Sequence, residues 1–98
     1  MRKITKKASE AFINAKNFSE SNMSVIVRPN VTVMALFGNE IAYRYNDPNQ
    51  TISITSAGWK TRTTKDRLNS IDGVNISQSK DTWYLNGNEW DGRLIDIN

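Results

Sequence analysis

The sequence of 98 residues, of which 38% are hydrophobic and 23% charged, has the composition of one small globular domain. It contains no histidine and no cysteine, which excludes disulfides, thiolate nucleophiles, imidazole bases and most zinc sites. The longest apolar run, Val31 to Phe37, is far shorter than the roughly 20 residues that a membrane-spanning helix needs. No apolar segment of signal-peptide length follows the basic N-terminus, so we expect no secretory signal. Together with the lack of cysteine, this favours a cytoplasmic location.

Charge is distributed unevenly along the chain. Thirteen Lys and Arg oppose ten Asp and Glu, which gives a net charge of +3, and after residue 67 acidic residues outnumber basic ones. Clustered cations attract phosphate backbones and acidic partners, although short basic runs can also be solvated surface, and a charge dipole can favour self-association. The two basic clusters are Arg2, Lys3, Lys6 and Lys7 near the N-terminus and Lys60, Arg62, Lys65 and Arg67 in the middle of the chain.

Residues 4–18 are predicted to form an amphipathic helix. Thr5 is a candidate N-cap, and the polar residues 17–22 are expected to form the loop that leaves the helix. Apolar residues at helical spacing give the helix one buried face, which consists of Ile4, Ala8, Ala11, Phe12 and Ala15.

After residue 22 the apolar period changes from 3.6 to 2, which predicts strands. Four strands are expected in succession, at residues 23–28, 31–37, 41–45 and 51–55, and turn signals such as Gly38–Asn39 separate them. Short connections between successive strands favour an antiparallel meander. The strand at 31–37 is apolar on both faces, so it should lie centrally, with a helix on one side and a further cover on the other.

The second half is predicted to contain a short helix and two or three further strands. Thr63 and Asp66 have the spacing of a capping box, which places the helix at residues 64–71, and Gly73 is a candidate for its left-handed cap. The other expected elements are a strand beginning at 74–76, a hairpin tip at 80–81, a strand at 83–85, a turn at Asn86–Gly87, a return segment or loop at 88–92 and a last strand at 93–97.

This order of elements predicts a single α+β domain spanning residues 1–98. The expected architecture is one antiparallel β-sheet of about six to seven strands, with the N-terminal amphipathic helix and the second short helix packed on it.

The sequence offers no catalytic set. General acid–base catalysis usually needs histidine or carboxylates with shifted pKa values, and the acidic residues are scattered, most of them in turns. Glu89 and Asp91 flank Trp90 and could form a carboxylate pair, but a solvated hairpin loop is the simpler interpretation. Phosphate-binding loops, nucleophile elbows and metal-binding loops are missing. We therefore expect a protein that is not an enzyme and that uses no cofactor and no metal.

A tryptophan, three threonines and four cations gather in residues 58–67, where a loop leads into the second predicted helix. Thr hydroxyls, Arg guanidinium groups and the start of a helix can bind phosphate, and a Trp face can stack on an unpaired base. Alternatively, the tryptophan closes the core over the sheet edge and the threonines only cap the helix. The residues predicted to contact nucleic acid or a partner are Trp59, Lys60, Arg62, Thr63, Thr64, Lys65 and Arg67, with Lys3, Lys6 and Lys7.

Aromatic residues in the predicted strands allow more than one interpretation. Tyr43 and Tyr45 share a strand face with Ile41 and could stack on RNA bases, but this combination is more typical of a core. Trp83 is expected in the core. Trp90 is either a plug at the end of the sheet or an exposed anchor for a partner.

Several stretches of the chain occur together in a known group of proteins. These are Ala57-Gly58-Trp59, then Thr63 to Asn69, and then Trp83 to Gly92, joined by Ile4 to Phe12 and Gly38 to Ala42. Over nearly the whole chain they resemble small accessory proteins encoded by tailed bacteriophages. The resemblance implies no catalytic residue. It implies a context in which small proteins bind and block host nucleases, toxins and signalling components of defence systems.

The leading hypothesis is a non-enzymatic phage accessory protein that binds RNA or a nucleic-acid-handling host protein, such as a nuclease or toxin, and so blocks host defence or toxin machinery. The small domain and its two-faced apolar strand favour a homodimer. The expected location is the host cell cytoplasm, and no membrane partner is expected. One alternative is a protein–protein inhibitor that uses the acidic C-terminal third and Trp90. The other is a sponge that holds a nucleotide signal between basic residues at a dimer seam.

Overall fold

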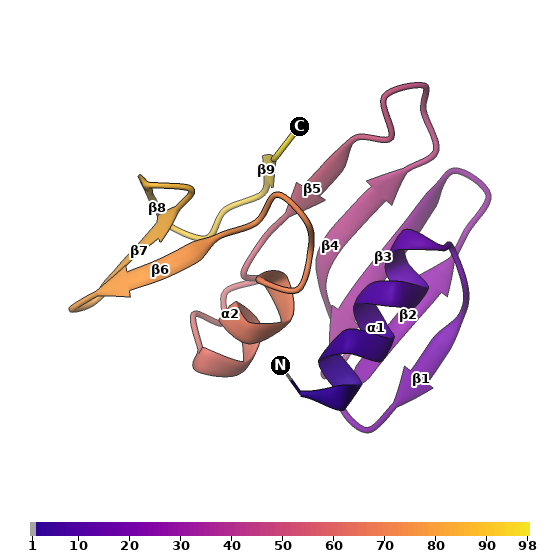
Figure 1. The fold of residues 1–98 in the computed structure, drawn as a ribbon, viewed down its shortest axis with the longest axis horizontal. Coiled ribbons are helices and arrows are strands. Elements are labelled where there is room, and N and C mark those ends of the chain that lie inside the picture. The colour runs from indigo at the N-terminus through magenta and orange to yellow at the C-terminus, as the bar shows by residue number, and fades with distance from the viewer. Residues whose placement is uncertain (1) are drawn as a thin grey trace.

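The computed structural model describes residues 2–98, which form two helices and nine strands in an α+β fold (Figure 1). The predicted fold class is therefore confirmed. The strands divide into two antiparallel sheets, one of six strands and one of three.

The larger sheet contains the predicted meander. Its strands follow the order β1-β2-β3-β4-β5-β9, and each is antiparallel to its neighbours. The strand that is apolar on both faces, β3, lies centrally as predicted. The bounds are β1 (Phe18–Glu20), β2 (Met23–Val27), β3 (Val31–Leu36), β4 (Asn39–Tyr45), β5 (Ile52–Ile54) and β9 (Ile95–Asp96).

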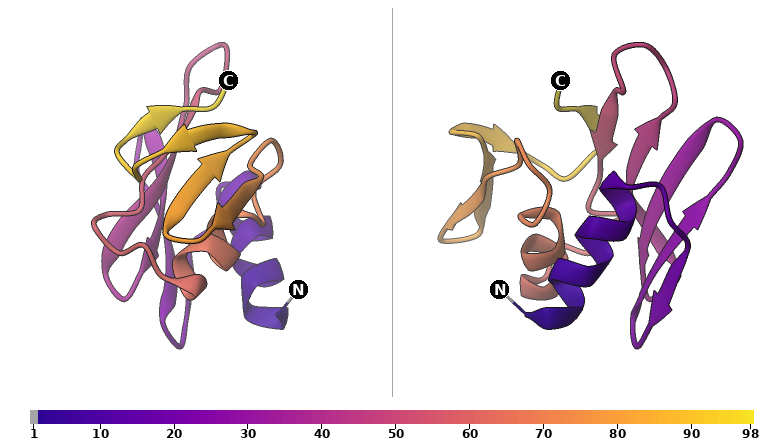
Figure 2. Two further views of the ribbon diagram at one scale, coloured as in Figure 1. Left: turned by 90° about the vertical axis from the view of Figure 1, so that its left-hand side faces the viewer. Right: turned by 45° about the vertical axis from the view of Figure 1, so that its right-hand side comes forward.

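The smaller sheet consists of β6 (Ile76–Ser79), β7 (Thr82–Leu85) and β8 (Asn88–Trp90), in that order. Its register confirms both predicted turns, because residue 79 pairs with residue 82 and residue 85 with residue 88. Residues 88–92, which the sequence left open between strand and loop, begin as β8. The chain then returns to the larger sheet, where β9 pairs with β5 (Figure 2).

A close backbone approach joins this returning segment to the end of β5. The Ser56 N–H donates to the Gly92 carbonyl oxygen at 2.8 Å. A Cβ atom at Gly92 would lie 2.4 Å from Ser56 Oγ, and the φ of Gly92 is +92°. Only glycine fits this position without displacing Ser56.

The core lies on one side of the six-stranded sheet, where both helices and the smaller sheet are found (Figures 1 and 2). The helix α1 (Lys3–Ile13) buries Ala8, Ala11 and Phe12, which confirms most of its predicted apolar face. The second helix, α2 (Arg62–Leu68), buries Leu68 in the same cluster. The sheet contributes buried residues to this cluster that include Met23, Val25, Met34, Leu36, Ile41, Ala42 and Ile54.

Both ends of α1 differ from the prediction. Arg2 is the N-cap, so the helix starts earlier, and Thr5 lies fully buried inside its first turns. The prediction of Thr5 as the cap is wrong because its hydroxyl bonds to α2 instead. At the other end, the helix stops at Ile13 and Ala15 takes a φ of 53°, so residues 14–18 do not continue it.

The cap of α2 also lies earlier than predicted. Thr61 is the N-cap, and its Oγ1 accepts a hydrogen bond from the Thr64 N–H at 3.2 Å. Thr63, the predicted cap, is therefore the second residue of the helix. The helix ends at Leu68, and Gly73, with a φ of +90°, shapes the loop before β6 rather than the helix end.

A change of register in the larger sheet moves one predicted core position. The pairing of β3 and β4 shifts between Met34 and Ala35, which makes Ile41 the extra residue of a β-bulge. Ile41 and Ala42 are therefore both buried, where strict alternation would bury only one of them. The prediction that Ile41 shares a face with Tyr43 is wrong for this reason.

Candidate binding pocket

Arg67 is removed from the predicted anion site because its guanidinium group is buried. Only 2% of Arg67 is exposed. Its Nη1 donates to Thr5 Oγ1 at 2.6 Å and to Asp66 Oδ2 at 2.7 Å, and its Nη2 donates to Asn22 Oδ1 at 3.5 Å. These bonds tie α2 to α1 and to the β1–β2 turn. The prediction that Arg67 contacts phosphate or a partner is therefore wrong.

The other cations of this cluster do not join Arg67 at one point. Lys65 Nζ donates to a side-chain amide oxygen on β6 at 3.0 Å. Lys60 Nζ lies 5.6 Å from the centroid of the Trp83 ring on β7. Arg62 is exposed at the start of α2. The four cations thus do not form the single convergent anion site that their spacing suggested.

The cations of the N-terminal cluster lie on the surface of α1. Lys3, Lys6 and Lys7 are exposed. Lys7 Nζ lies 3.5 Å from Glu20 Oε1, an exposed ion pair of the kind that adds little stability. Thr5 bonds to Asp66 at 2.9 Å, so this end of α1 lies beside α2.

Trp90 is a plug of the smaller sheet. Its exposure is 6%, its ring lies 6.1 Å from that of Trp83, and its Nε1–H donates to the Arg93 carbonyl oxygen at 2.9 Å. Trp83 is 2% exposed, which confirms its place in the core. The alternative in which Trp90 anchors a partner is wrong, because its side chain is already buried within the chain.

Tyr43 and Tyr45 lie half-buried on the face of β4 that points away from the core. Their rings stack on each other, with centroids 6.3 Å apart, and the Tyr43 hydroxyl donates to Glu40 Oε1 at 2.9 Å. Partial burial raises the pKa of Tyr43, and the hydrogen bond to the Glu40 carboxylate raises it further. Stacking of RNA bases on these rings stays a prediction.

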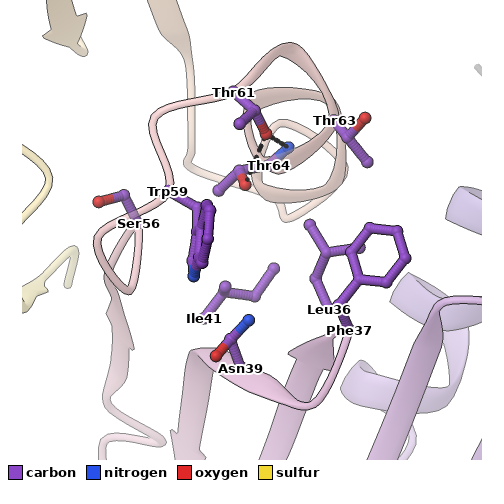
Figure 3. A pocket seen from close by; sticks show the side chains of 9 residues that line it. All are labelled: Leu36, Phe37, Asn39, Ile41, Ser56, Trp59, Thr61, Thr63 and Thr64. Atoms are coloured by element: carbon purple, nitrogen blue, oxygen red, sulfur yellow. Dashed lines mark hydrogen bonds between the residues drawn. The ribbon is translucent and has the colours of Figure 1, made fainter.

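Two exposed aromatic side chains stand on opposite sides of a pocket of about 330 Å³ (Figure 3). Trp59 is 58% exposed and Phe37 is 72% exposed. Leu36 and Ile41 lie between them (Figure 3). The pocket thus combines the predicted residues Trp59, Thr63 and Thr64 with the β3–β4 hairpin. Its polar lining residues are Asn39, Ser56, Thr61, Thr63 and Thr64.

The Phe37 side of the pocket is built by a strained turn. Leu36 pairs with Asn39, so Phe37 and Gly38 form the two-residue turn, and their φ angles are 52° and 79°. The Phe37 N–H donates to the Asn22 carbonyl oxygen at 2.7 Å, which ties this turn to the β1–β2 turn. A left-handed conformation costs a residue with a Cβ atom roughly 1–2 kcal/mol. Both its conformation and its exposure therefore make phenylalanine a poor choice for folding here.

Phe37 was not predicted as a site residue, because the strand was expected to extend through it and the turn was expected at Gly38–Asn39. A signal was present: Phe37 directly precedes the glycine of a short hairpin, a position at which Asn or Asp is usual. An aromatic residue at this position indicates a side chain displayed to solvent.

The Trp59 side is built by a second tight turn. Ala57 and Gly58 take φ angles of 54° and 85°, and the Trp59 N–H donates to the Ser56 carbonyl oxygen at 2.9 Å. The Trp59 carbonyl oxygen accepts from the N–H of Thr61, the cap of α2, also at 2.9 Å. The backbone of Trp59 is thus fixed between β5 and α2 while its ring is exposed. The interpretation that Trp59 closes the core is therefore wrong.

The lining of the pocket is uncharged. Its nine lining residues carry no charged side chain (Figure 3). The groups with shifted pKa values, Tyr43, Asp47 and Asp91, do not line it. Within residues 2–98, no three acidic side chains lie close enough together to hold a metal ion. The arrangement can hold an apolar group between two rings and offer hydroxyl and amide groups at its margin.

A family model covers almost the whole chain. The model described as Kyanoviridae Gp96 protein matches residues 1–95. No curated protein and no solved structure matches the chain. Across residues 2–98, neither helix has both the length and the apolar character that crossing a membrane requires.

Proposed function

Because the chain belongs to the Kyanoviridae Gp96 protein family, a family of phage proteins, we propose that it is a non-enzymatic phage accessory protein that binds another protein. The contact surface is the pocket between Phe37 and Trp59. The observation that carries the proposal is the exposure of these two aromatic side chains on opposite walls of one apolar pocket.

Apolar surface that gathers at one place on a protein, as these two aromatic side chains do around the pocket, is typical of an interaction site. Tryptophan and other aromatic residues dominate the energy of protein–protein contacts, where they fill or form apolar pockets at the centre of the interface. Hydrogen-bonded turns also hold the backbone on both sides of the pocket. A backbone that is already ordered loses little conformational entropy on binding.

A protein partner fits this pocket better than RNA does. Binding along an RNA backbone depends on several cations that meet successive phosphates. Here Arg67 is buried, and Lys60 and Lys65 are directed to the smaller sheet. The lining of the pocket is uncharged. Contacts made by an apolar pocket persist at high salt, whereas contacts with phosphates weaken.

The class of host protein that would be bound follows from the resemblance to phage accessory proteins. Host nucleases, toxins and signalling components of defence systems are the partners that the resemblance to phage accessory proteins implies, and the host cytoplasm is where they would be met. The expected homodimer stays a prediction.

Affinity capture from a host lysate tests the proposal. We expect the immobilised protein to retain a host protein at high salt and after ribonuclease treatment, and Trp59→Ser to reduce this retention at least about tenfold. Leu94→Ser is the matched control, because Leu94 is exposed to 56%, close to the 58% of Trp59, but does not line the pocket.

Two outcomes would contradict the proposal. Loss of all retained material after ribonuclease treatment would show that RNA, not protein, is bound. Equal retention by the wild type and Trp59→Ser would show that the contact lies outside the pocket.

A further inference from the structure

The side of the six-stranded sheet opposite the core, hereafter the outer face, is apolar over β2, β3 and β4. Both helices and the smaller sheet lie on the core side, and within residues 2–98 no element covers this part of the outer face (Figures 1 and 2). Its central strand turns Val31, Val33 and Ala35 outward, and the last two are buried without belonging to the core cluster. The solvated face of an antiparallel sheet normally carries polar side chains. The composition of the outer face is therefore that of a covered surface.

The outward side chains on the two sides of β3 differ in size. Tyr43 and Tyr45 stand on the β4 side, and Ser24 and Ile26 stand on the β2 side. Val33 pairs with Tyr43 on one side and with Ile26 on the other. Ile26 is 40% exposed, and both tyrosines are half-buried. The outer face is therefore higher along β4 than along β2.

The charged groups at the centre of the outer face neutralise each other. Arg28, which directly follows β2, donates from Nη2 to Glu40 Oε2 on β4 at 3.3 Å. The other carboxylate oxygen of Glu40 accepts from the Tyr43 hydroxyl at 2.9 Å. Because the pair joins the β2 side to the β4 side, no net charge remains over β3. Two copies of the chain, each with a net charge of +3, therefore meet no added repulsion at this surface.

The outer face is complementary to itself under one symmetry operation. In a two-fold dimer, every contact of one residue with another occurs twice. A two-fold axis nearly parallel to β3 lays the high β4 side of each copy on the low β2 side of the other, as in aligned packing of two sheets. An axis across the strands would instead set tyrosines against tyrosines and leave the β2 sides apart.

The register gives the contacts that this axis would form. Ile26 lies opposite the second copy's Tyr43, because both pair with the same residue of β3. Arg28 lies beside Val31, which pairs with Tyr45. The Arg28 guanidinium therefore comes to the ring of the second copy's Tyr45, where a cation–π contact is favourable. Arginine and tyrosine are both enriched at the centres of protein interfaces.

We propose that the outer face binds a second copy of this chain, with the two copies related by a two-fold axis nearly parallel to β3. The inference goes beyond the proposed function and does not depend on it. Leu36 and Ile41, which line the pocket, belong to the core cluster, so the pocket lies on the core side and stays open in the dimer. The dimer presents two pockets, which strengthens the capture of a partner that offers two contacts.

Sedimentation equilibrium from about 5 to about 500 µM protein tests for this dimer, since a face of three strands is a small interface with an expected dissociation constant in the micromolar range. The apparent mass of the wild type should rise with concentration toward twice that of the chain. Ile26→Glu should weaken the dimer at least about tenfold, because it places a carboxylate in an apolar contact. Ile13→Glu is the matched control and should dimerise like the wild type. Ile13 is exposed to 41%, but it lies on α1, on the core side.

A second measurement on the wild type locates the contact without any substitution. In a mixture of 13C-labelled and unlabelled protein, isotope-filtered NMR detects only contacts between copies. We expect such contacts between the Ile26 methyl groups and the Tyr43 ring. Urea denaturation of each variant shows whether it is folded.

Four results would overturn the inference. These are a wild type that stays monomeric at every concentration, a dimer that Ile26→Glu leaves unchanged, contacts between copies that map to another face, and oligouridine that shifts the Tyr43 and Tyr45 signals of a monomeric protein. The last result would assign the outer face to RNA. If the wild type is monomeric but lysate capture still depends on Trp59, only this inference fails and the proposed function stands.

Discussion

Two hairpin turns of this protein have nearly the same sequence and backbone conformation, but their first turn residues differ. In one turn this side chain bonds to the adjacent loop, and in the other it is exposed. Residues 36–40 read Leu-Phe-Gly-Asn-Glu and residues 85–89 read Leu-Asn-Gly-Asn-Glu. The turn residues have φ angles of 52° and 79° in the first and 50° and 88° in the second. The Asn86 side chain accepts from the Asn75 N–H at 2.9 Å and donates to the Gly73 carbonyl oxygen at 3.0 Å. The Phe37 side chain is 72% exposed at the margin of the pocket.

The comparison indicates that Asn86 serves folding, whereas Phe37 serves binding. Asparagine tolerates the left-handed conformation and satisfies two backbone groups of the adjacent loop. Phenylalanine in the same conformation adds strain and exposes apolar surface. The hairpin at Phe37 is instead held from outside, because its N–H donates to Asn22, whose side chain accepts from Arg67.

The largest change in stability is expected when Arg67, which bonds to Asn22 and so supports the hairpin at Phe37, is replaced. Arg67→Ala should lower the free energy of unfolding by about 3 kcal/mol, because it breaks an ion pair whose arginine is buried and leaves Thr5 and Asn22 without their donor. The lower end of the usual range applies, since Asp66 is 37% exposed and can regain water. Urea denaturation measures the change. A loss of less than about 0.5 kcal/mol would show that Arg67 is not structural.

A smaller loss is expected when the second turn receives the residue of the first. Asn86→Phe should destabilise the protein by about 2 kcal/mol, because two hydrogen bonds are lost at about 1 kcal/mol each and the new side chain is strained. The midpoint of urea denaturation should fall while its slope is unchanged. A variant as stable as the wild type would mean that the Asn86 contacts contribute nothing.

The smallest change in stability is expected when Arg62 is replaced. Arg62→Ala should change the free energy of unfolding by less than about 0.5 kcal/mol, because its side chain is exposed and no ion pair among residues 2–98 includes it. Thermal denaturation beside the wild type measures this. A clear loss of stability would place Arg62 with Arg67 among the residues that hold the fold.

Local patterns predicted most of the fold. Most of the buried face of α1 and the turns at 80–81 and 86–87 depend on neighbours in the chain, and the structure confirms them. The prediction that residues 17–22 form only a loop is wrong, because Phe18–Glu20 form β1 and pair with β2. The start of α2 was misplaced because Thr61 and Thr63 both suit a cap. The bulge at Ile41 was missed because it depends on the pairing of β3 with β4.

The candidate site was less predictable because it depends on contacts between distant residues. Thr5 and Arg67 are 62 residues apart in the sequence, and no local pattern shows that one buries the other. Trp59 was identified from its place beside the cations, but its pocket partner, Phe37, lies in the β3–β4 turn, whereas Trp59 lies between β5 and α2. The sequence therefore indicated the Trp59 wall of the pocket. It also predicted that the neighbouring cations bind the ligand, whereas in the structure they do not line the pocket.

The most direct test of the separation between folding and binding is Phe37→Asn, which gives the first turn the residue of the second. Its free energy of unfolding and its capture of a host protein should be measured side by side. We predict a gain in stability of about 1 kcal/mol, since Asn relieves the left-handed strain, together with loss of capture. A variant that is destabilised by about 1 kcal/mol or more, or one that captures its partner as well as the wild type, would contradict the assignment of Phe37 to binding.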